Sequence, residues 1–425
     1  GWLTASRATR LISGIVIFGA IGRYLGPEQF GQLNFAIGLT TIFAAVATLG
    51  FEGIVIRELV LLPDEPHRVL GTAFILRLLG ALLAIALVVL STLPSADFLL
   101  AKLALIVSLS YLPGAGDVIE LWFQKNIDAR RSFQARIVAT IVISIFRVIL
   151  IWQKAPLAAF AWTSFIESAV GFLCLGIVYQ RSGAPRITSW WWNSGIASRI
   201  LSLTWPLILS GILVATYARI EQLLVKAVLG DYVLGIYYAS IRISDSWSFV
   251  PPVLLMTIYP ILVAKRETSE PGAFREKLQT VFDLVTGVGY AIAAGATVAA
   301  PVLIPLVFGE KYRAAVPVLI IQAWTAPILF SGAVRAQYFL LENLNIYHTV
   351  SAIIGIIANI GFGLWFMHLL GAPGAALAAL VAGWISACGT SLIFPKLRTS
   401  GLLQIQAFLF PLRIRSIVQQ FRILS

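Results

Sequence analysis

Long uninterrupted apolar runs constrain this chain more than any other feature of its sequence. A helix needs about 20 apolar residues to cross the ~30 Å hydrocarbon core of a bilayer. Runs of this length recur along almost the whole chain, and only 12% of its 425 residues are charged, against roughly 25% in soluble domains. The runs are continuous rather than alternating in ten-residue segments, so they do not indicate a barrel. The sequence therefore predicts an all-α integral membrane protein.

The apolar runs predict twelve transmembrane helices. Short polar or glycine-marked segments separate them, and each run is long enough for one crossing. The expected spans are about 3–23, 31–56, 70–91, 100–124, 135–152, 157–179, 200–228, 235–262, 278–308, 315–341, 349–370 and 374–394.

The distribution of Lys and Arg predicts the orientation. Loops that follow even-numbered spans, together with the C-terminal tail, hold 17 of these residues, whereas loops that follow odd-numbered spans hold 5. Positively charged loops stay in the cytoplasm, so both termini are predicted to be cytoplasmic. This asymmetry also accounts for most of the net charge of +12, and no nucleic acid partner is needed to explain it.

Two stretches with the same layout indicate an internal repeat. "YLGPEQFGQLNFAI" at 24–37 and "VLGDYVLGIYYASI" at 228–241 align with a shift of 204, which pairs Gly26 with Gly230. A shift of 217 pairs "PLAAFA" at 156–161 with "PGAALA" at 373–378. Both glycine stretches are turns between apolar segments. The chain is therefore predicted to consist of two six-helix halves.

The repeat predicts the domain organisation. We expect an N-terminal six-helix lobe at 1–185, a linker at 186–199, a C-terminal six-helix lobe at 200–394 and a cytoplasmic basic amphipathic tail at 395–425. Six is an even number, so both halves enter the membrane from the same side. Parallel repeats of this kind place a substrate path between the halves, and we expect a central cavity there.

Cations within the predicted spans indicate a polar interior. Each would cost at least ~2.5 kcal/mol if it faced lipid at mid-bilayer. Anions in the spans offer only partial pairing, and the alternative that such pairs lock helices together stays open. The cationic excess suits an anionic substrate, because Arg holds phosphate through a bidentate fork. The nine cations are Arg7, Arg10, Arg57, Arg77, Arg147, Arg219, Lys226, Arg242 and Arg335, and the six anions are Glu52, Asp117, Glu120, Glu167, Glu221 and Asp245.

The sequence resembles a known family of transporters. "YLGPEQFGQLNFAI", "LGFEGIVIREL" at 49–59, "LVFGEKYRAAVPVL" at 306–319 and "LLGAPGAALAALVAG" at 369–383 are similar to stretches of the O-antigen and capsule flippases. These belong to the multidrug/oligosaccharidyl-lipid/polysaccharide exporter superfamily. The resemblance covers about residues 1–400. It implies a MATE-like fold of twelve helices in two lobes around a central cavity.

The resemblance also implies site residues. "YYASIRISDSWSFVPP" at 237–252 is similar to the eighth helix of related lipid II flippases, which implies that Arg242, with Asp245 three residues on, contacts the pyrophosphate. Arg57 resembles the Arg that ends the second helix there, and Glu221 stands where many polysaccharide flippases have an acid. The expected cavity residues are Arg242, Arg57, Arg219, Arg335, Arg147, Arg10 and Asp245, and the candidates for ion coupling are Glu221, Asp245 and Asp117.

The resemblance implies a flippase for a polyprenyl-pyrophosphate-linked oligosaccharide repeat unit in a bacterial inner membrane. It would act in surface polysaccharide synthesis, with a polysaccharide polymerase as a partner, and would need no cofactor or covalent chemistry. No Cys pair or histidine cluster has metal-ligand spacing. Two alternatives stay open: a multidrug exporter of the same superfamily, against which the Arg excess argues, and a membrane-embedded polysaccharide polymerase or ligase, for which the short outer loops leave little room.

Overall fold

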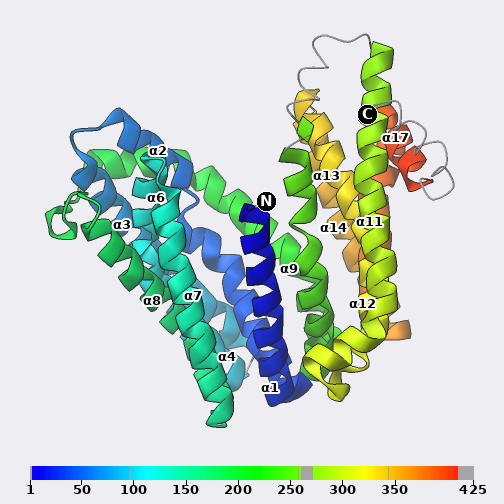
Figure 1. The fold of residues 1–425 in the computed structure, drawn as a ribbon, viewed down its shortest axis with the longest axis horizontal. Helices are drawn as coiled ribbons and strands as arrows, with labels where there is room; N and C mark the ends of the chain where they lie inside the picture. The colour runs from blue at the N-terminus through cyan, green and yellow to red at the C-terminus, as the bar shows by residue number, and fades with distance from the viewer. Residues whose placement is uncertain (1, 96, 257, 260–270, 343, 410–425) are drawn as a thin grey trace. The chain divides into compact units, whose positions relative to one another are not determined.

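Helices form all the regular structure of the computed structural model in the residues that it describes, which are 2–95, 97–256, 258–259, 271–342 and 344–409 (Figure 1). Side chains are described from Gly14 onward, so the side chain of Arg10, one of the predicted site residues, lies outside the described part. The predicted all-α membrane fold class is confirmed.

Ten helical segments are long and apolar enough to cross a membrane, in the part of the chain that the structure describes. Two of them far exceed the ~20 residues that a bilayer requires, since Gly14–Leu61 has 48 residues and Ser194–Met256 has 63. Each of the two covers most of a pair of the predicted spans, and in each a glycine with a non-helical backbone lies between the two spans. The predicted number of twelve is therefore not reproduced as such, and the difference arises at these two glycines.

The two glycines that the repeat pairs adopt the same backbone conformation. Gly26 interrupts α1 (Trp2–Thr48) with φ 74° and ψ 169°, and Gly230 interrupts α9 (Ser194–Ser244) with φ 81° and ψ −179°. Only glycine adopts this region without strain. No atom lies within 4 Å of a Cβ built at either position, so the backbone conformation alone requires glycine. Gly26 and Gly230, which the sequence alignment pairs, thus also have the same turn geometry.

A second pair of aligned positions also shares a positive φ. Lys154, which precedes α8 (Leu157–Gln180), has φ 53°, and Gly371, which joins α14 (Asn345–Leu370) to α15 (Ala372–Trp384), has φ 64°. They are separated by the shift that aligns 156–161 with 373–378. This conformation costs a residue with a Cβ roughly 1–2 kcal/mol. The two aligned positions thus share a positive φ, although only one of them is glycine.

The chain forms two compact units. Unit 1 comprises residues 1–28 and 223–425, and unit 2 comprises residues 29–222. These boundaries differ from those of the predicted lobes, because the helix before Gly26 groups with the second half and the start of α9 groups with the first. A repeat reports how two stretches of sequence correspond, whereas contacts report which segments pack together. The lobes at 1–185 and 200–394 therefore remain a prediction that rests on the sequence repeat.

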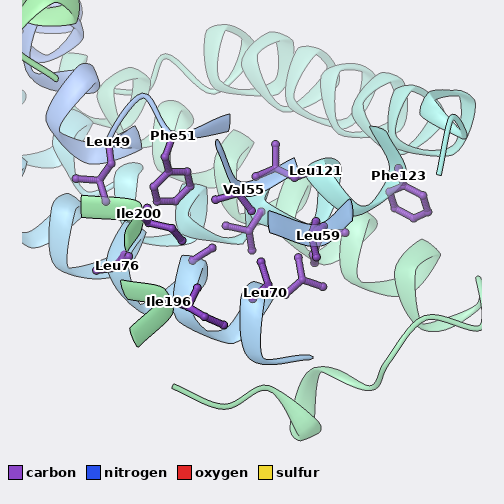
Figure 2. Packing of buried hydrophobic residues seen from close by; sticks show 14 of the residues in the cluster. Leu49, Phe51, Val55, Leu59, Leu70, Leu76, Leu121, Phe123, Ile196 and Ile200 are labelled. Atoms are coloured by element: carbon purple, nitrogen blue, oxygen red, sulfur yellow. The ribbon is translucent and has the colours of Figure 1, made fainter. Parts of the chain in front are cut away.

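Unit 2 is organised around one large apolar core. Val55 and Leu59 of α2 (Glu52–Leu61) are fully buried there. Figure 2 shows them close to Leu70, with Ile196 and Ile200 from the start of α9 in the same cluster. This core holds together the helix segments that carry most of the charged residues of the unit. The other helices of unit 2 are α3 (Pro66–Thr92), α4 (Phe98–Ser108), α5 (Tyr111–Gly114), α6 (Val118–Lys125), α7 (Ala129–Trp152) and α8.

Two predicted spans of unit 2 are interrupted. The span expected at 31–56 ends at Thr48, because the chain turns through Gly50 (φ 60°) before α2 begins at Glu52. The span expected at 100–124 is divided into α4, α5, the 3-10 helix η2 (Ala115–Asp117) and α6. Pro113 lies at this break, where its ring and missing N–H disfavour a continuous helix. Each interruption leaves a carboxylate, Glu52 or Asp117, at the start of a helix.

Unit 1 packs the C-terminal helices against α11 (Pro271–Phe308). The last of them, α17 (Arg398–Phe408), lies beside α11 in Figure 1, and Gln279 of α11 donates to the Leu403 carbonyl at 3.2 Å. The tail predicted at 395–425 is therefore packed as far as Phe408, and residues 410–425 lie outside the described part. Further helices of unit 1 are α12 (Ala315–Ala323), α13 (Ala326–Leu341), α14, α15, the π-helix η6 (Ile385–Gly389) and α16 (Thr390–Ile393).

The first part of α1 belongs to unit 1 because it packs against the end of α11 and the turn that follows. The Tyr312 hydroxyl donates to the Gly22 carbonyl at 2.9 Å, and Arg23 Nε donates to the Val307 carbonyl at 3.0 Å. A Cβ at Gly19 would lie 2.5 Å from that same carbonyl oxygen, so glycine permits the close approach. Burial raises the pKa of Tyr312, which keeps its hydroxyl protonated as a donor.

Candidate functional site

Arg242 lies against the first part of α1, within unit 1. Its guanidinium carbon is 3.8 Å from the centroid of the Phe18 ring, and a Cβ at Gly14 would lie 3.7 Å from its Nη2. The ring quadrupole attracts a cation in this position. Asp245 opens the 3-10 helix η4 (Asp245–Trp247) that follows α9, and its side chain is exposed. The structure thus places both predicted residues at the end of α9.

Arg335 of α13 is buried, with 4% of its surface exposed. Its Nη1 donates to the Ala387 carbonyl at 2.6 Å and to Ser391 Oγ at 3.0 Å, and its Nη2 donates to the Ser386 carbonyl at 3.0 Å. Ser386 and Ala387 belong to the π-helix η6, and π-helices displace the regular i−4 hydrogen bonds. No carboxylate contacts Arg335 among the described residues. Backbone and hydroxyl dipoles therefore accommodate this cation.

Arg147 joins two neighbouring helices of unit 2. Its Nη2 is 2.8 Å from Glu167 Oε2, and its Nε donates to Thr163 Oγ1 at 3.3 Å. Arg147 lies on α7 and both partners lie on α8, and these two helices run side by side in Figure 1. This contact is the ion pair between two helices that the sequence analysis left open as an alternative to a substrate-binding role for such cations.

Five charged residues form a network in unit 2, which we call the Asp117 network. Arg136 of α7 contacts Asp117 Oδ1 and Glu120 Oε1, each at 2.6 Å. Arg77 of α3 is 4% exposed, lies 3.5 Å from Glu52 and is also in the field of Asp117 and Glu120. Its Nη1 has no hydrogen-bond partner among the described residues. The three carboxylates and two guanidinium groups come from four helices and one 3-10 turn.

Sequence reasoning missed Arg136, because it placed this residue in a cytoplasmic loop. The helix α7 begins at Ala129, six residues earlier than the predicted span, so Arg136 lies two turns inside it. The three-residue spacing of Asp117 and Glu120, which puts both on one helical face, was a usable signal that a cation is held there.

Arg57 belongs to a second charged group, which we call the Glu58 cluster. Glu58 of α2 has a fully buried side chain. Arg57 Nη2 lies 3.5 Å from its Oε1, and Arg199 Nη1 lies 3.1 Å from its Oε2. Arg199 comes from the start of α9. Sequence reasoning counted Arg199 as a loop cation and did not consider Glu58.

The remaining predicted residues do not join these groups into one site. Arg219 Nη1 donates to Gln222 Oε1 at 3.2 Å, and Glu221 is partly buried on the same stretch of α9. Arg57, Asp117 and Arg147 each have a different set of partners, so these three predicted residues lie in separate charged groups of unit 2 rather than in one site. In the described part of the chain, no group of three or more His, Cys, Asp or Glu could hold a metal ion.

The fold is similar to that of transporters of known structure. An inward-facing multidrug resistance MATE family transporter of the MOP superfamily is 14% identical, with a TM-score of 0.71 over 92% of this chain and 95% of that chain. The lipid II flippase MurJ in an inward closed conformation is 15% identical, with a TM-score of 0.66 over 99% of this chain and 97% of that chain. A MOP superfamily transporter from Pyrococcus furiosus is 15% identical, with a TM-score of 0.56 over 93% and 96%.

The helical architecture and these likenesses define the class: a multi-pass membrane protein with the fold of MATE-type transporters. The chain belongs to the polysaccharide biosynthesis protein family, whose model matches residues 20–317. No curated protein sequence matches the chain. The family match confirms the resemblance found in the sequence.

Proposed function

We propose that this protein moves a polyprenyl-pyrophosphate-linked oligosaccharide repeat unit from the cytoplasmic to the outer leaflet of a bacterial inner membrane. The family match over residues 20–317 carries this proposal, because it connects a transporter fold with polysaccharide biosynthesis. The likeness to a lipid II flippase supports the class of substrate. Alternating access would move the sugars and the pyrophosphate while the prenyl tail stays in lipid. Both termini would be cytoplasmic, and a polysaccharide polymerase of the O-antigen or capsule pathway would use the product.

Arg242 is the residue that we propose for contact with the pyrophosphate. The guanidinium lies 3.8 Å from the centroid of the Phe18 ring, and a guanidinium group can bind an oxyanion through a bidentate fork. Arg57 is proposed for the same role in unit 2, where its side chain is 55% exposed. Arg147 and Arg335 have structural contacts, so direct substrate contact would require these contacts to open.

The Asp117 network is the proposed place of ion coupling in unit 2. Two cations share three carboxylates there, so a proton or small cation would balance the extra negative charge. Glu221 and Asp245 stay proposals for the same role.

A multidrug exporter is the second candidate, because the MATE transporter has the TM-score of 0.71. At 14% identity this likeness concerns the fold alone. The two candidates differ in the charge of the substrate, which makes transport assays decisive.

The test uses purified full-length protein in liposomes that contain a fluorescent prenyl-diphosphate oligosaccharide. Accessibility of the label to an external quencher measures flipping. We expect flipping by the wild-type protein, none by Arg242→Ala and partial flipping by Arg242→Lys, since a point charge lacks the guanidinium fork. Unchanged flipping by Arg242→Ala would remove Arg242 from the site. Export of a cationic dye without lipid flipping would instead establish the multidrug exporter.

A further inference from the structure

The Glu58 cluster combines a buried carboxylate with two accessible cations. The Glu58 side chain is 0% exposed, whereas the side chains of Arg57 and Arg199 are 55% and 56% exposed. Each guanidinium contacts a different oxygen of the carboxylate, and neither has another hydrogen bond to a described residue. A guanidinium has five N–H donors. Most of the donors in the cluster are thus uncommitted, and the cluster has a net positive charge.

Ordinary surface ion pairs in the same unit look different. In the pairs Arg68–Glu65 and Arg131–Asp128, the carboxylate is 41% and 39% exposed, and it has one Arg. Such pairs contribute little and hold nothing in place. In the Glu58 cluster the carboxylate is removed from solvent and is shared by two cations. Its geometry fits a residue that positions the two guanidinium groups beside each other.

The apolar core of unit 2 makes this arrangement rigid. Val55 and Leu59, on either side of Arg57 and Glu58 in α2, are fully buried. Ile196 and Ile200, on either side of Arg199 in α9, lie in the same core, as Figure 2 shows. Contact between residues 141 positions apart in the sequence is therefore held by packing on both sides. A rigid pair of cations loses little entropy when it binds an anion.

The position of the cluster along its helices suits a group in the lipid headgroup layer. Arg57 lies four residues before the end of α2 at Leu61, and Arg199 lies five residues after the start of α9 at Ser194. At a rise of 1.5 Å per residue, each is about 6–8 Å from a helix end. The tryptophans Trp191 and Trp192, exposed just before α9, are residues typical of the membrane interface. Such tryptophans are enriched at the level of the lipid headgroups, where lipid phosphates also lie.

We propose that Arg57 and Arg199, positioned by Glu58, form a two-sided binding site for the diphosphate of a prenyl lipid. This inference rests on the proposed function and adds Arg199 and Glu58 to its residues. Each guanidinium offers a fork to one phosphate group, and two adjacent forks match a diphosphate better than a single phosphate. The carboxylate of Glu58 prevents the two cations from repelling each other in the absence of the lipid.

Binding of farnesyl diphosphate to the full-length protein in neutral-lipid nanodiscs tests the site. We expect Arg199→Gln and Arg57→Gln each to raise the Kd about tenfold, because each removes charge-assisted hydrogen bonds. Arg68→Gln is the matched control, since it removes an exposed, paired Arg of the same unit, and its Kd should equal that of the wild type. Farnesol should not bind, and farnesyl monophosphate should bind more weakly than the diphosphate.

Glu58→Gln separates positioning from simple charge. This variant raises the net charge of the cluster, so an unpositioned site would bind the diphosphate more tightly. If Glu58 positions the two cations, the same variant binds the diphosphate several-fold more weakly. Thermal unfolding of each variant reports whether it is folded. If Glu58→Gln does not fold, the two Arg variants test the site, because their substituted side chains are exposed in the wild type.

The outcomes distinguish this site from the proposed function. Wild-type affinity in Arg199→Gln, with binding intact, would overturn the site and leave the function standing. Absence of any binding of the diphosphate to the wild type would overturn both. A dependence on Arg57 and Arg199 that is seen only with phosphatidylglycerol nanodiscs, and not with the diphosphate, would show an anchor for anionic phospholipid and would also overturn the site.

Discussion

Arg77 in unit 2 and Arg335 in unit 1 are equally buried, with 4% of each exposed, but their surroundings differ. Arg77 has a carboxylate at 3.5 Å and two further carboxylates nearby, while its Nη1 has no hydrogen-bond partner in the described part of the chain. Arg335 has no carboxylate among its described contacts, and its two Nη atoms donate to carbonyls and hydroxyls of the segment that contains the π-helix. One cation is balanced by charge, and the other is solvated by dipoles.

This difference shows that an intramembrane cation is not by itself a substrate ligand. A buried charge needs either an opposite charge or enough hydrogen bonds. Arg335 meets the second condition through hydrogen bonds from both Nη atoms, so it fits a structural role. Arg77 satisfies neither condition fully, because its ion pair is long and one donor is left over. The contacts of Arg77 in the Asp117 network can therefore rearrange more easily than those of Arg335.

The largest expected effect is that of removing Arg335. Arg335→Met should lower the free energy of unfolding by about 2–3 kcal/mol, because it removes the hydrogen bonds that Arg335 donates to the Ser386 and Ala387 carbonyls and to Ser391 Oγ. SDS-induced unfolding in mixed micelles measures this loss. The free energy of unfolding of Arg335→Lys should lie between those of the wild type and Arg335→Met, since lysine keeps the charge but loses the guanidinium fork. Arg313→Met, at an exposed ion pair of the same unit, is the control. Wild-type stability in Arg335→Met would show that dipoles do not hold this side chain.

Removal of Arg77 should have a smaller effect, of about 1–2 kcal/mol. Arg77→Met loses attraction to the carboxylates, but it also removes a buried donor that has no acceptor, and these contributions have opposite signs. The same unfolding assay measures the change. The loss should be smaller still in a Glu52→Gln background, because the ion-pair partner is then already absent. A loss as large as that of Arg335→Met would contradict the distinction between the two cations.

The Arg147–Glu167 pair should couple by about 1–2 kcal/mol. A double-mutant cycle with Arg147→Leu and Glu167→Leu isolates this term from the packing of α7 on α8. The doubly substituted protein should be more stable than either single variant, because each single variant leaves one charge unpaired between helices. Additive losses would mean that the 2.8 Å contact contributes nothing.

The smallest effect is expected at Arg219. Its described partner is Gln222, one turn away on the same helix, and hydrogen bonds between side chains in membrane proteins average about 0.6 kcal/mol. Arg219→Ala should therefore change the free energy of unfolding by about 0.5 kcal/mol or less. If flipping is lost at unchanged stability, Arg219 acts on the substrate. A large destabilisation would place it instead with Arg335.

Features that depend on neighbouring residues alone could be predicted from the sequence. The apolar runs predicted the helical membrane fold, since bilayer thickness sets the length of a span. The shift of 204 predicted that Gly26 and Gly230 are equivalent, and their shared φ and ψ angles agree with it. Helix ends were less accurate: the expected span at 31–56 ran past the turn at Gly50, because hydropathy alone does not register a break in an apolar segment.

The membership of the family, the helical class and the presence of intramembrane cations were thus determined by the sequence. Their partners were decided by the tertiary structure. Arg136 meets Glu120 across 16 residues and Arg199 meets Glu58 across 141. The acceptors of Arg335 are carbonyls in a π-helix that no residue type marks and hydroxyl groups just after it. Charge is a property of one residue, whereas the free energy of burying it depends on whatever the fold brings within about 4 Å. That is why counting cations indicated a polar interior, and only packing separated cations held in place from those left accessible to a ligand.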